Sequence, residues 1–137
     1  MQNTELFQKI IAGEIPCEKV YEDENVFAFL DINPVNPGHT LVIPKKWSNG
    51  LLDADQETLR QLMPAIQQIA QAIKNATGCD GVNIIQNEGD AAGQKVFHLH
   101  FHVIPRFAND GYEPWHGKPY ADAEQVKQMG ESIRAKL

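Results

Sequence analysis

Hydrophobic residues recur with two different periods along the chain. A helical period covers Thr4 to Ala12, a long segment from Asp53 to Gly78, and a last segment that follows Asp122. A period of two covers residues 18–21, 26–31, 40–43, 82–87 and 96–106. Alternation places every second side chain on one face of a strand, whereas spacing of three or four marks one face of a helix. The sequence therefore predicts an α+β fold with an antiparallel sheet of about five strands, one long helix and two shorter ones.

The long helix has recognisable ends. Asp53, with Gln56 three residues later, is typical of a capping box, and Gly78 can adopt the left-handed conformation that closes a helix. Pro64 lies inside the helix, where we expect it to remove a hydrogen bond and produce a kink. The apolar stripe that we expect to cover the sheet consists of Leu59, Leu62, Met63, Ile66, Ile69, Ala70 and Ile73.

The segment from Val96 to Arg106 carries three of the five histidines. His98, His100 and His102, here called the histidine row, are two residues apart, so on a strand they share one face. The opposite face would consist of Phe97, Leu99, Phe101 and Val103. Pro105 has no N–H to donate, so the strand should end there or lie at a sheet edge.

Three interpretations of the row are open from the residues alone. The row is a solvated strand face, or it contributes to a metal site, or it is an array of nucleophile and acid–base groups. At about 3.3 Å per residue, His98 and His102 lie roughly 13 Å apart, so only neighbouring histidines could share one zinc ion. A row of neutral imidazoles near pH 7 could instead attack a phosphorus atom and donate protons to the oxygens around it.

Composition narrows the function classes. The chain of 137 residues has an ordinary share of hydrophobic residues, which predicts a single domain over 1–137, with a core of about 4–106 and a C-terminal loop and helix over 107–137. The net charge of −6 argues against a nucleic-acid binder. Cys17 and Cys79 form no paired motif, which suits a reducing cytoplasm. The sequence shows neither a secretion leader nor an apolar run that could span a membrane, so we expect no membrane partner.

The histidine row and its surroundings resemble the histidine triad (HIT) superfamily of nucleotide hydrolases and transferases. The segment His98-Leu99-His100-Phe101-His102-Val103-Ile104 is similar to the family's His-φ-His-φ-His-φ-φ signature, in which φ is a hydrophobic residue. The resemblance extends through Asn87-Glu88-Gly89 and Gly93-Gln94, and upstream to Ala28-Phe29-Leu30-Asp31-Ile32 and Gly38-His39-Thr40. It covers most of residues 7 to 106 in the same order.

The resemblance implies roles for the histidines. It makes His100 the nucleophile that attacks the α-phosphorus of a purine nucleoside phosphoramidate or related conjugate, with a nucleotidyl-histidine intermediate and release of AMP or GMP. His102 would lie against the phosphate and assist the leaving group. His98 and His39 would position these two rings. No cofactor is implied.

The resemblance also implies a nucleotide site. The carboxylate of Asp31, which ends a predicted strand, would bind the ribose hydroxyls, although by itself it could equally cap the turn at Asn33-Pro34. Residues expected to contact the base or nucleoside are Phe29, Ile32, Phe7 and Ile10, and those expected at the phosphate are Asn87, Gly93, Gln94 and Lys95. Backbone N–H groups of the loop 88–95 could cradle phosphate oxygens.

Several features separate this chain from parts of the family. Many members have Ser or Thr after Gly-Gln, where this chain has Lys95, which could contact a polyphosphate or face solvent. A zinc-bearing subgroup has a cysteine pair near the N-terminus, where this chain has Glu5 and Gln8, and a histidine at the position of Trp47, so no metal is expected. Trp115 and His116 could shape specificity. The alternatives left open are a diadenosine polyphosphate hydrolase, a nucleotide-binding regulator with little turnover, and a metal-dependent hydrolase; the resemblance further implies a homodimer.

Overall fold

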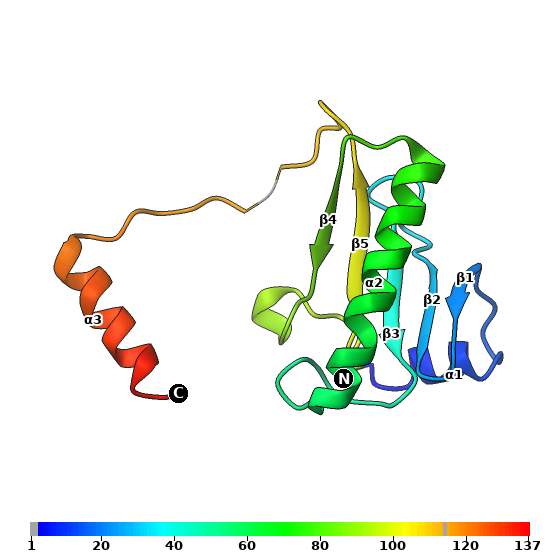
Figure 1. The fold of residues 1–137 in the computed structure, drawn as a ribbon, viewed down its shortest axis with the longest axis horizontal. Helices are drawn as coiled ribbons and strands as arrows, with labels where there is room; N and C mark the ends of the chain where they lie inside the picture. Colours follow the sequence, from blue (N-terminus) through cyan, green and yellow to red (C-terminus); the bar gives the residue numbers. More distant parts are fainter. Residues whose placement is uncertain (1–2, 114) are drawn as a thin grey trace.

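The computed structural model describes residues 3–113 and 115–137, and these form one antiparallel sheet with helices beside it (Figure 1). In chain order, the elements of the described residues are α1 (Leu6–Ile11), β1 (Lys19–Glu22), β2 (Val26–Leu30), β3 (Thr40–Pro44), α2 (Gln56–Thr77), β4 (Gly81–Ile85), the 3₁₀ helix η1 (Asp90–Ala92), β5 (Phe101–Arg106) and α3 (Ala123–Arg134). The strand order is β1-β2-β3-β5-β4, and every neighbouring pair is antiparallel. The predicted α+β class with five strands is confirmed.

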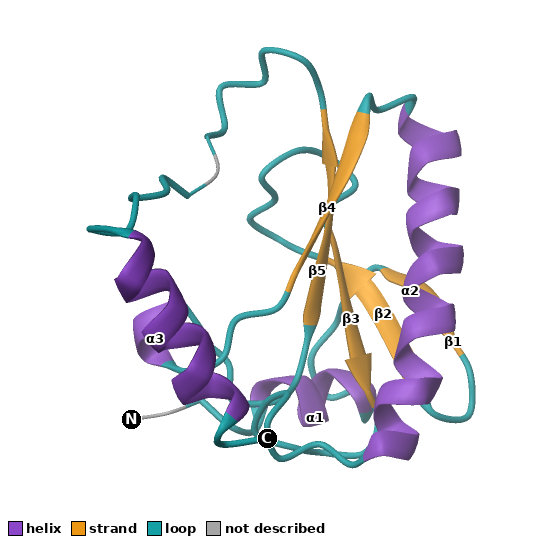
Figure 2. Ribbon diagram, turned by 60° about the vertical axis from the view of Figure 1, so that its left-hand side comes forward, coloured by secondary structure: helices purple, strands orange, loops and turns teal. Residues whose placement is uncertain are grey.

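Alternation along the strands builds a core on each face of the sheet. Val26, Ala28 and Val42 pack with the buried face of α2, whereas Phe27 and Phe29 belong to a second cluster that includes residues of α1. Figure 2 shows α2 along one side of the sheet. The strands β2 and β3 are therefore buried on both faces, which explains their nearly continuous hydrophobic sequence.

The long helix begins two residues later than its sequence predicts. The N-cap is Asp55, whose carboxylate accepts a hydrogen bond from the backbone N–H of Thr58, and not Asp53. Asp53 instead accepts hydrogen bonds from the backbone N–H groups of Asn49 and Gly50, so it organises the preceding loop. The helix continues through Pro64 and ends at Gly78 in the left-handed conformation, as predicted.

The apolar stripe of α2 also differs in detail from the prediction. Met63 is 51% exposed, whereas Ala65, which the stripe did not include, is buried. Ala65 is in the buried face because it lies three residues after Leu62 and four before Ile69, both of which are buried. Met63 lies instead beside β4, in a shallow apolar groove.

Two predictions about the strand that carries the histidines are wrong. The strand starts at Phe101 and not at Val96, because the preceding N–H groups bond elsewhere: Phe97 N–H to the carbonyl of Asn3, and Leu99 N–H to that of Ser48. The strand also includes Pro105, although β5 lies inside the sheet. β3 pairs with β5 only as far as Val103, so the missing N–H of proline breaks no bond of that ladder.

The last part of the chain leaves the sheet. Figure 1 shows an extended segment that ends in α3, which lies apart from the other elements on the β4 side. The hydrophobic residues of α3, among them Val126, Met129 and Ile133, are about half exposed. None of the helices in residues 3–113 and 115–137 combines the length and the hydrophobicity needed to cross a membrane.

Candidate active site

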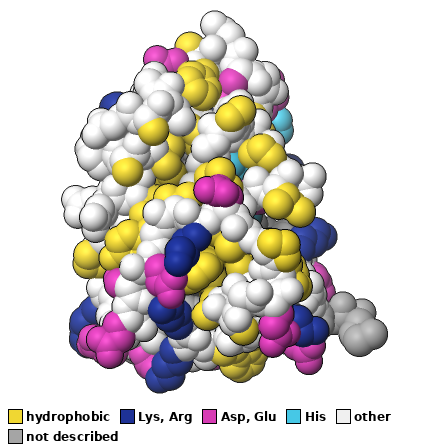
Figure 3. Space-filling view, turned by 90° about the vertical axis from the view of Figure 1, so that its right-hand side faces the viewer, with side chains coloured by type: hydrophobic (Ala, Val, Ile, Leu, Met, Phe, Trp, Pro, Cys, Tyr) yellow, Lys and Arg dark blue, Asp and Glu magenta, His cyan; other side chains and the backbone are white. Residues whose placement is uncertain are grey.

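The histidine row forms a compact cluster with His39, which stands immediately before β3. The ring centroids of His100 and His102 are 5.0 Å apart, and those of His39 and His102 are 5.1 Å apart. His98, His39 and His100 are buried, at 0%, 5% and 6% exposure. On the side of the molecule shown in Figure 3, hydrophobic patches alternate with charged groups and little histidine is visible. The interpretation of the row as a solvated strand face is therefore wrong.

Backbone carbonyl groups set the positions of the protons on His98 and His100. Nε2 of His98 lies 2.7 Å from the carbonyl oxygen of Pro44, and Nδ1 of His100 lies 2.8 Å from that of His98. A carbonyl oxygen only accepts, so each of these nitrogens carries a hydrogen. In neutral His100 the lone pair is consequently on Nε2, where a nucleophile needs it.

A chain of two hydrogen bonds sets the protons on His39 and His102. The backbone N–H of Val35 donates to Nδ1 of His39 at 3.1 Å, so neutral His39 carries its hydrogen on Nε2. That Nε2 lies 2.9 Å from Nδ1 of His102, which must then accept. Neutral His102 therefore carries its own hydrogen on Nε2, the nitrogen available to an acid–base step.

Burial keeps these rings uncharged. It is the largest cause that lowers the pKa of His39, His98, His100 and His102 below the usual value of histidine. The pKa of His102 falls to about 4, because the neighbouring rings of His100 and His39 add to the effect of burial. All four rings are neutral at pH 7, as the hydrogen-bond assignment requires.

A cavity of about 510 Å³ opens beside the cluster. Its apolar wall includes Leu6, Phe7, Ile10, Ile15, Phe29, Leu41 and Val96, and its polar wall includes Asp31, Asn33, Asn87, Lys95, His100 and His102. The ring of Phe7 meets the ring of His100 edge-on, with centroids 5.1 Å apart. The volume is within the range typical of small-molecule sites, and the two walls suit a ligand with one flat apolar end and one polar end.

The structure brings the predicted nucleoside contacts together around this cavity. Phe7, Ile10 and Phe29 are buried in its wall, while Ile32 is 88% exposed at its rim. One oxygen of the Asp31 carboxylate accepts from the N–H of Asn33, as a turn cap does, and the other lies 3.7 Å from Nε2 of His39. Asp31 therefore caps the turn and also lines the cavity, while its contact with the ribose hydroxyls stays a prediction.

The predicted phosphate contacts divide into two groups. One group consists of Asn87, Gly93 and Lys95, which line the cavity. Within residues 3–113 and 115–137, the backbone carbonyl of Asn87 accepts a hydrogen bond from Gln86, but its side-chain amide forms none. Gln94 does not line the cavity. Its side chain bonds with Gly89, Asn49 and Val96, and its own N–H donates to the Gly89 carbonyl.

Half of the N–H groups of the expected cradle are already occupied. Within the loop 88–95, which contains η1, the N–H groups of Gly89, Ala92, Gly93 and Gln94 all donate inside the loop itself. They close a tight turn, so the N–H groups of Gly93 and Gln94 already have partners in the protein. The predicted contacts of Gly93 and Gln94 with a phosphate stay a prediction.

Among the described residues, one group of potential ligands lies close enough together to share a metal ion: Asp31, His39 and His102. Their hydrogen bonds do not favour one. Because the Val35 N–H occupies Nδ1 of His39, its Nε2 carries a hydrogen, and this hydrogen lies between the two rings. A metal bound there would have to displace that proton and break the bond between the rings.

Comparison with known proteins agrees with this geometry. The HIT domain family model matches residues 12–109. The adenosine 5'-monophosphoramidase hnt1 of Schizosaccharomyces pombe is 37% identical over 96% of this chain and 97% of that protein, and the adenylylsulfatase HINT3 of Arabidopsis thaliana is 43% identical over 80% of this chain and 56% of that protein. A crystal structure of a HIT family member from Bacillus subtilis has a TM-score of 0.89 and 42% identity, covering 96% of both chains. With His100 and His102 in the wall of the cavity and a family model that spans the whole sheet, this chain belongs to the HIT family of proteins.

Proposed function

We propose that this protein hydrolyses purine nucleoside phosphoramidates and related nucleotide conjugates at the α-phosphate, through a nucleotidyl-His100 intermediate. The observation that carries the proposal is the bond from Nδ1 of His100 to the carbonyl of His98, which leaves the lone pair on Nε2. The monophosphoramidase and adenylylsulfatase activities named for two relatives act on bonds of the same kind, between an adenylyl group and a leaving group.

The cavity accommodates such a substrate in one orientation. The base lies against Phe7, Phe29 and Ile10, where aromatic and aliphatic groups cover its faces. The ribose hydroxyls donate to the free oxygen of Asp31. The phosphate then reaches the polar wall, between His100, His102 and the side-chain amide of Asn87.

The reaction proceeds in two displacements. Nε2 of His100 attacks phosphorus and forms a P–N bond while the bond to the leaving nitrogen breaks, and the Nε2–H of His102 donates a hydrogen bond to a phosphate oxygen. A water molecule gives the leaving nitrogen its proton and becomes hydroxide, which attacks phosphorus and displaces His100 to release the nucleoside monophosphate. The proton balance closes because one water molecule supplies both the proton of the leaving group and the hydroxyl of the product.

The proposal is tested by following AMP release from adenosine 5'-phosphoramidate in excess EDTA. Wild type should turn over, and His100→Ala should lose on the order of 10³-fold or more in kcat. Gln68→Ala is the control, because this side chain is exposed on α2, which packs on the face of the sheet opposite the cavity. Rapid quenching should trap protein heavier by one adenylyl group. Binding of AMP without any turnover would support a regulatory protein instead, and loss of activity in EDTA would support a metal-dependent hydrolase.

Lys95 favours a second substrate class, the diadenosine polyphosphates. Its side chain lines the cavity next to Val96, on the polar side where further phosphates would extend. A higher kcat/KM for diadenosine tetraphosphate than for the phosphoramidate would establish this class. In that case Lys95→Ser should lower kcat/KM for the polyphosphate and spare that for the phosphoramidate.

We also propose that the protein is a homodimer whose interface includes the outer edge of β4. Within residues 3–113 and 115–137 this strand pairs only with β5, so its other edge is unpaired there, and Ile84 on it is 49% exposed. Beside it, an apolar groove of about 640 Å³ runs between α2 and β4. Light scattering after size exclusion should give twice the chain mass for wild type and the single mass for Ile84→Lys. A monomeric wild type would refute the proposal.

A further inference from the structure

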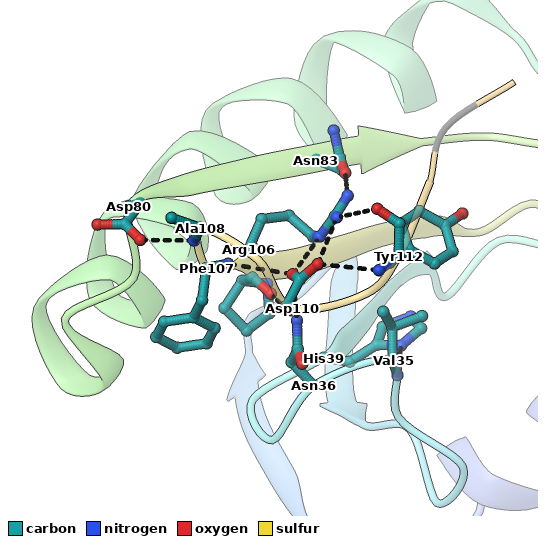
Figure 4. A network of polar contacts seen from close by, with 11 residues as sticks. Val35, Asn36, His39, Asp80, Asn83, Arg106, Phe107, Ala108, Asp110 and Tyr112 are labelled. Carbon is teal, nitrogen blue, oxygen red and sulfur yellow. Dashed lines mark hydrogen bonds and ion pairs between the residues drawn. The ribbon is translucent and has the colours of Figure 1, made fainter. Parts of the chain in front are cut away.

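A polar network connects the end of β5 with the loop that carries His39 (Figure 4). Its centre is the carboxylate of Asp110, which accepts two hydrogen bonds from the guanidinium of Arg106, at 2.8 Å each, and two from the backbone N–H groups of Phe107 and Tyr112. The Asp110 side chain is 7% exposed. These donors hold the pKa of Asp110 far below its usual value, with Arg106 as the largest cause, which favours the charged carboxylate.

The side chain of Asn36 joins this network to the loop 33–38. Its amide donates to the Asp110 carboxylate at 3.0 Å and to the backbone carbonyl of Pro105 at 2.9 Å. Pro105 stands three residues after His102 on β5. Asn36 therefore fastens the loop to the strand that carries the histidine row.

The same loop holds His39 by its backbone. The N–H of His39 donates to the carbonyl of Asn36, and the N–H of Val35 donates to Nδ1 of the imidazole. The second of these bonds decides which nitrogen of His39 carries the hydrogen, and so which nitrogen of His102 does. A shift of the loop by one ångström or so would weaken it, since hydrogen bonds depend steeply on distance and angle.

We propose that Asn36 and Asp110 are positioning residues, which fix the tautomers of His39 and His102 by anchoring the loop 33–38 to β5. The proton on Nε2 of His102 then depends on a carboxylate at the base of the C-terminal segment, outside the histidine row. The kinetic consequence rests on the proposed function, but the tautomers themselves do not.

The test compares two asparagines of the same network. Asn36→Ala removes the link to the loop. Asn83→Ala is the matched control, because Asn83 accepts a 2.6 Å hydrogen bond from Arg106 on the β4 side, and among the described residues its side chain forms no hydrogen bond with the loop 33–38. Ring nitrogens are observed by long-range ¹⁵N–¹H NMR at pH 7.5, which separates protonated from unprotonated nitrogen, and kcat and KM are measured with adenosine 5'-phosphoramidate.

We expect the ring ¹⁵N shifts of His39 and His102 to move toward tautomer averages in Asn36→Ala and to stay at wild-type values in Asn83→Ala. The value of kcat should fall about 10- to 100-fold in Asn36→Ala with little change in KM, as for other groups that orient a reacting side chain. The Asn83→Ala variant should lose thermal stability but keep kcat within about twofold of wild type.

Should Asn36→Ala be too unstable to study, Asp110→Asn keeps the volume of the side chain but turns an amide toward hydrogen-bond donors, and it should give the same shifts. Unchanged ring shifts in a folded Asn36→Ala or Asp110→Asn protein would overturn the inference, as would equal losses of kcat in Asn36→Ala and Asn83→Ala. If the ring shifts change in Asn36→Ala but the wild-type protein never releases AMP, the proposed function is refuted and the positioning role still holds.

Discussion

Acid should destabilise this protein between pH 6.5 and pH 4 because its histidine cluster is buried in the neutral form. In the unfolded chain His102 takes up a proton near pH 6.5, whereas in the folded protein its pKa is about 4. Within this window the unfolded state binds more protons, so the free energy of unfolding falls as the pH falls. Above pH 6.5 both states are neutral and the group has no effect on stability.

The size of the effect follows from the shift. One pKa unit corresponds to about 1.4 kcal/mol, so His102 alone would cost at most about 2 kcal/mol on going from pH 8 to pH 5. This ring is partly accessible to water, and solvent screening reduces the value to about 1 kcal/mol. His39, His98 and His100 act in the same direction, because burial lowers the pKa of each. The low pKa values of Asp55 and Asp110 have their effect at more acidic pH.

Urea unfolding at fixed protein concentration, followed by tryptophan fluorescence, measures the change in the free energy of unfolding between pH 8 and pH 5. Trp47 is a suitable reporter, since its indole N–H donates to the carbonyl of Phe97, next to the histidine row. His102→Gln should reduce the loss of stability between pH 8 and pH 5 by about 1 kcal/mol, and His116→Gln, at an exposed position, should leave it unchanged. Equal stability of the wild type at the two pH values, or an equal slope in the two variants, would show that the cluster does not resist protonation.

Three substitutions test the scaffold by chemical denaturation. Gly38→Ala should cost about 1–3 kcal/mol, because φ is +104° and the new Cβ would lie 3.1 Å from Thr77 and 3.3 Å from Pro105. Asp55→Ala removes the N-cap of α2 and should cost about 1 kcal/mol, which is measured as a lower urea midpoint with an unchanged m-value. Leu62→Ala empties a fully buried position and should cost about 2–5 kcal/mol; a loss below 1 kcal/mol would contradict the assigned core.

The sequence predicts this fold well where a pattern is local. Alternation identified all five strands, and the spacing of the histidine row predicted a group of neighbouring imidazoles. The errors arise where a tertiary contact replaces a regular one. The carbonyl of Ser48 takes the N–H of Leu99, so the strand starts late, and Asp53 bonds to the loop before it, so Asp55 caps the helix. No periodicity in the sequence reports either contact.

In the candidate site, too, the sequence predicts one part and not the other: it predicts which residue types gather, but not where their protons lie. The spacing of the histidines predicts that imidazoles gather, but it does not say which nitrogen of each ring carries the hydrogen. That choice is made by backbone groups of Val35, Pro44 and His98, which almost any residue at those positions would supply, proline at position 35 excepted. The sequence must place those backbone groups correctly. Residues distant in the chain contribute to this, as Asn36 and Asp110 do for the loop 33–38. Substitutions in the loop 33–38 or at Asp110 should therefore alter acid–base chemistry at His102 while leaving every histidine in place.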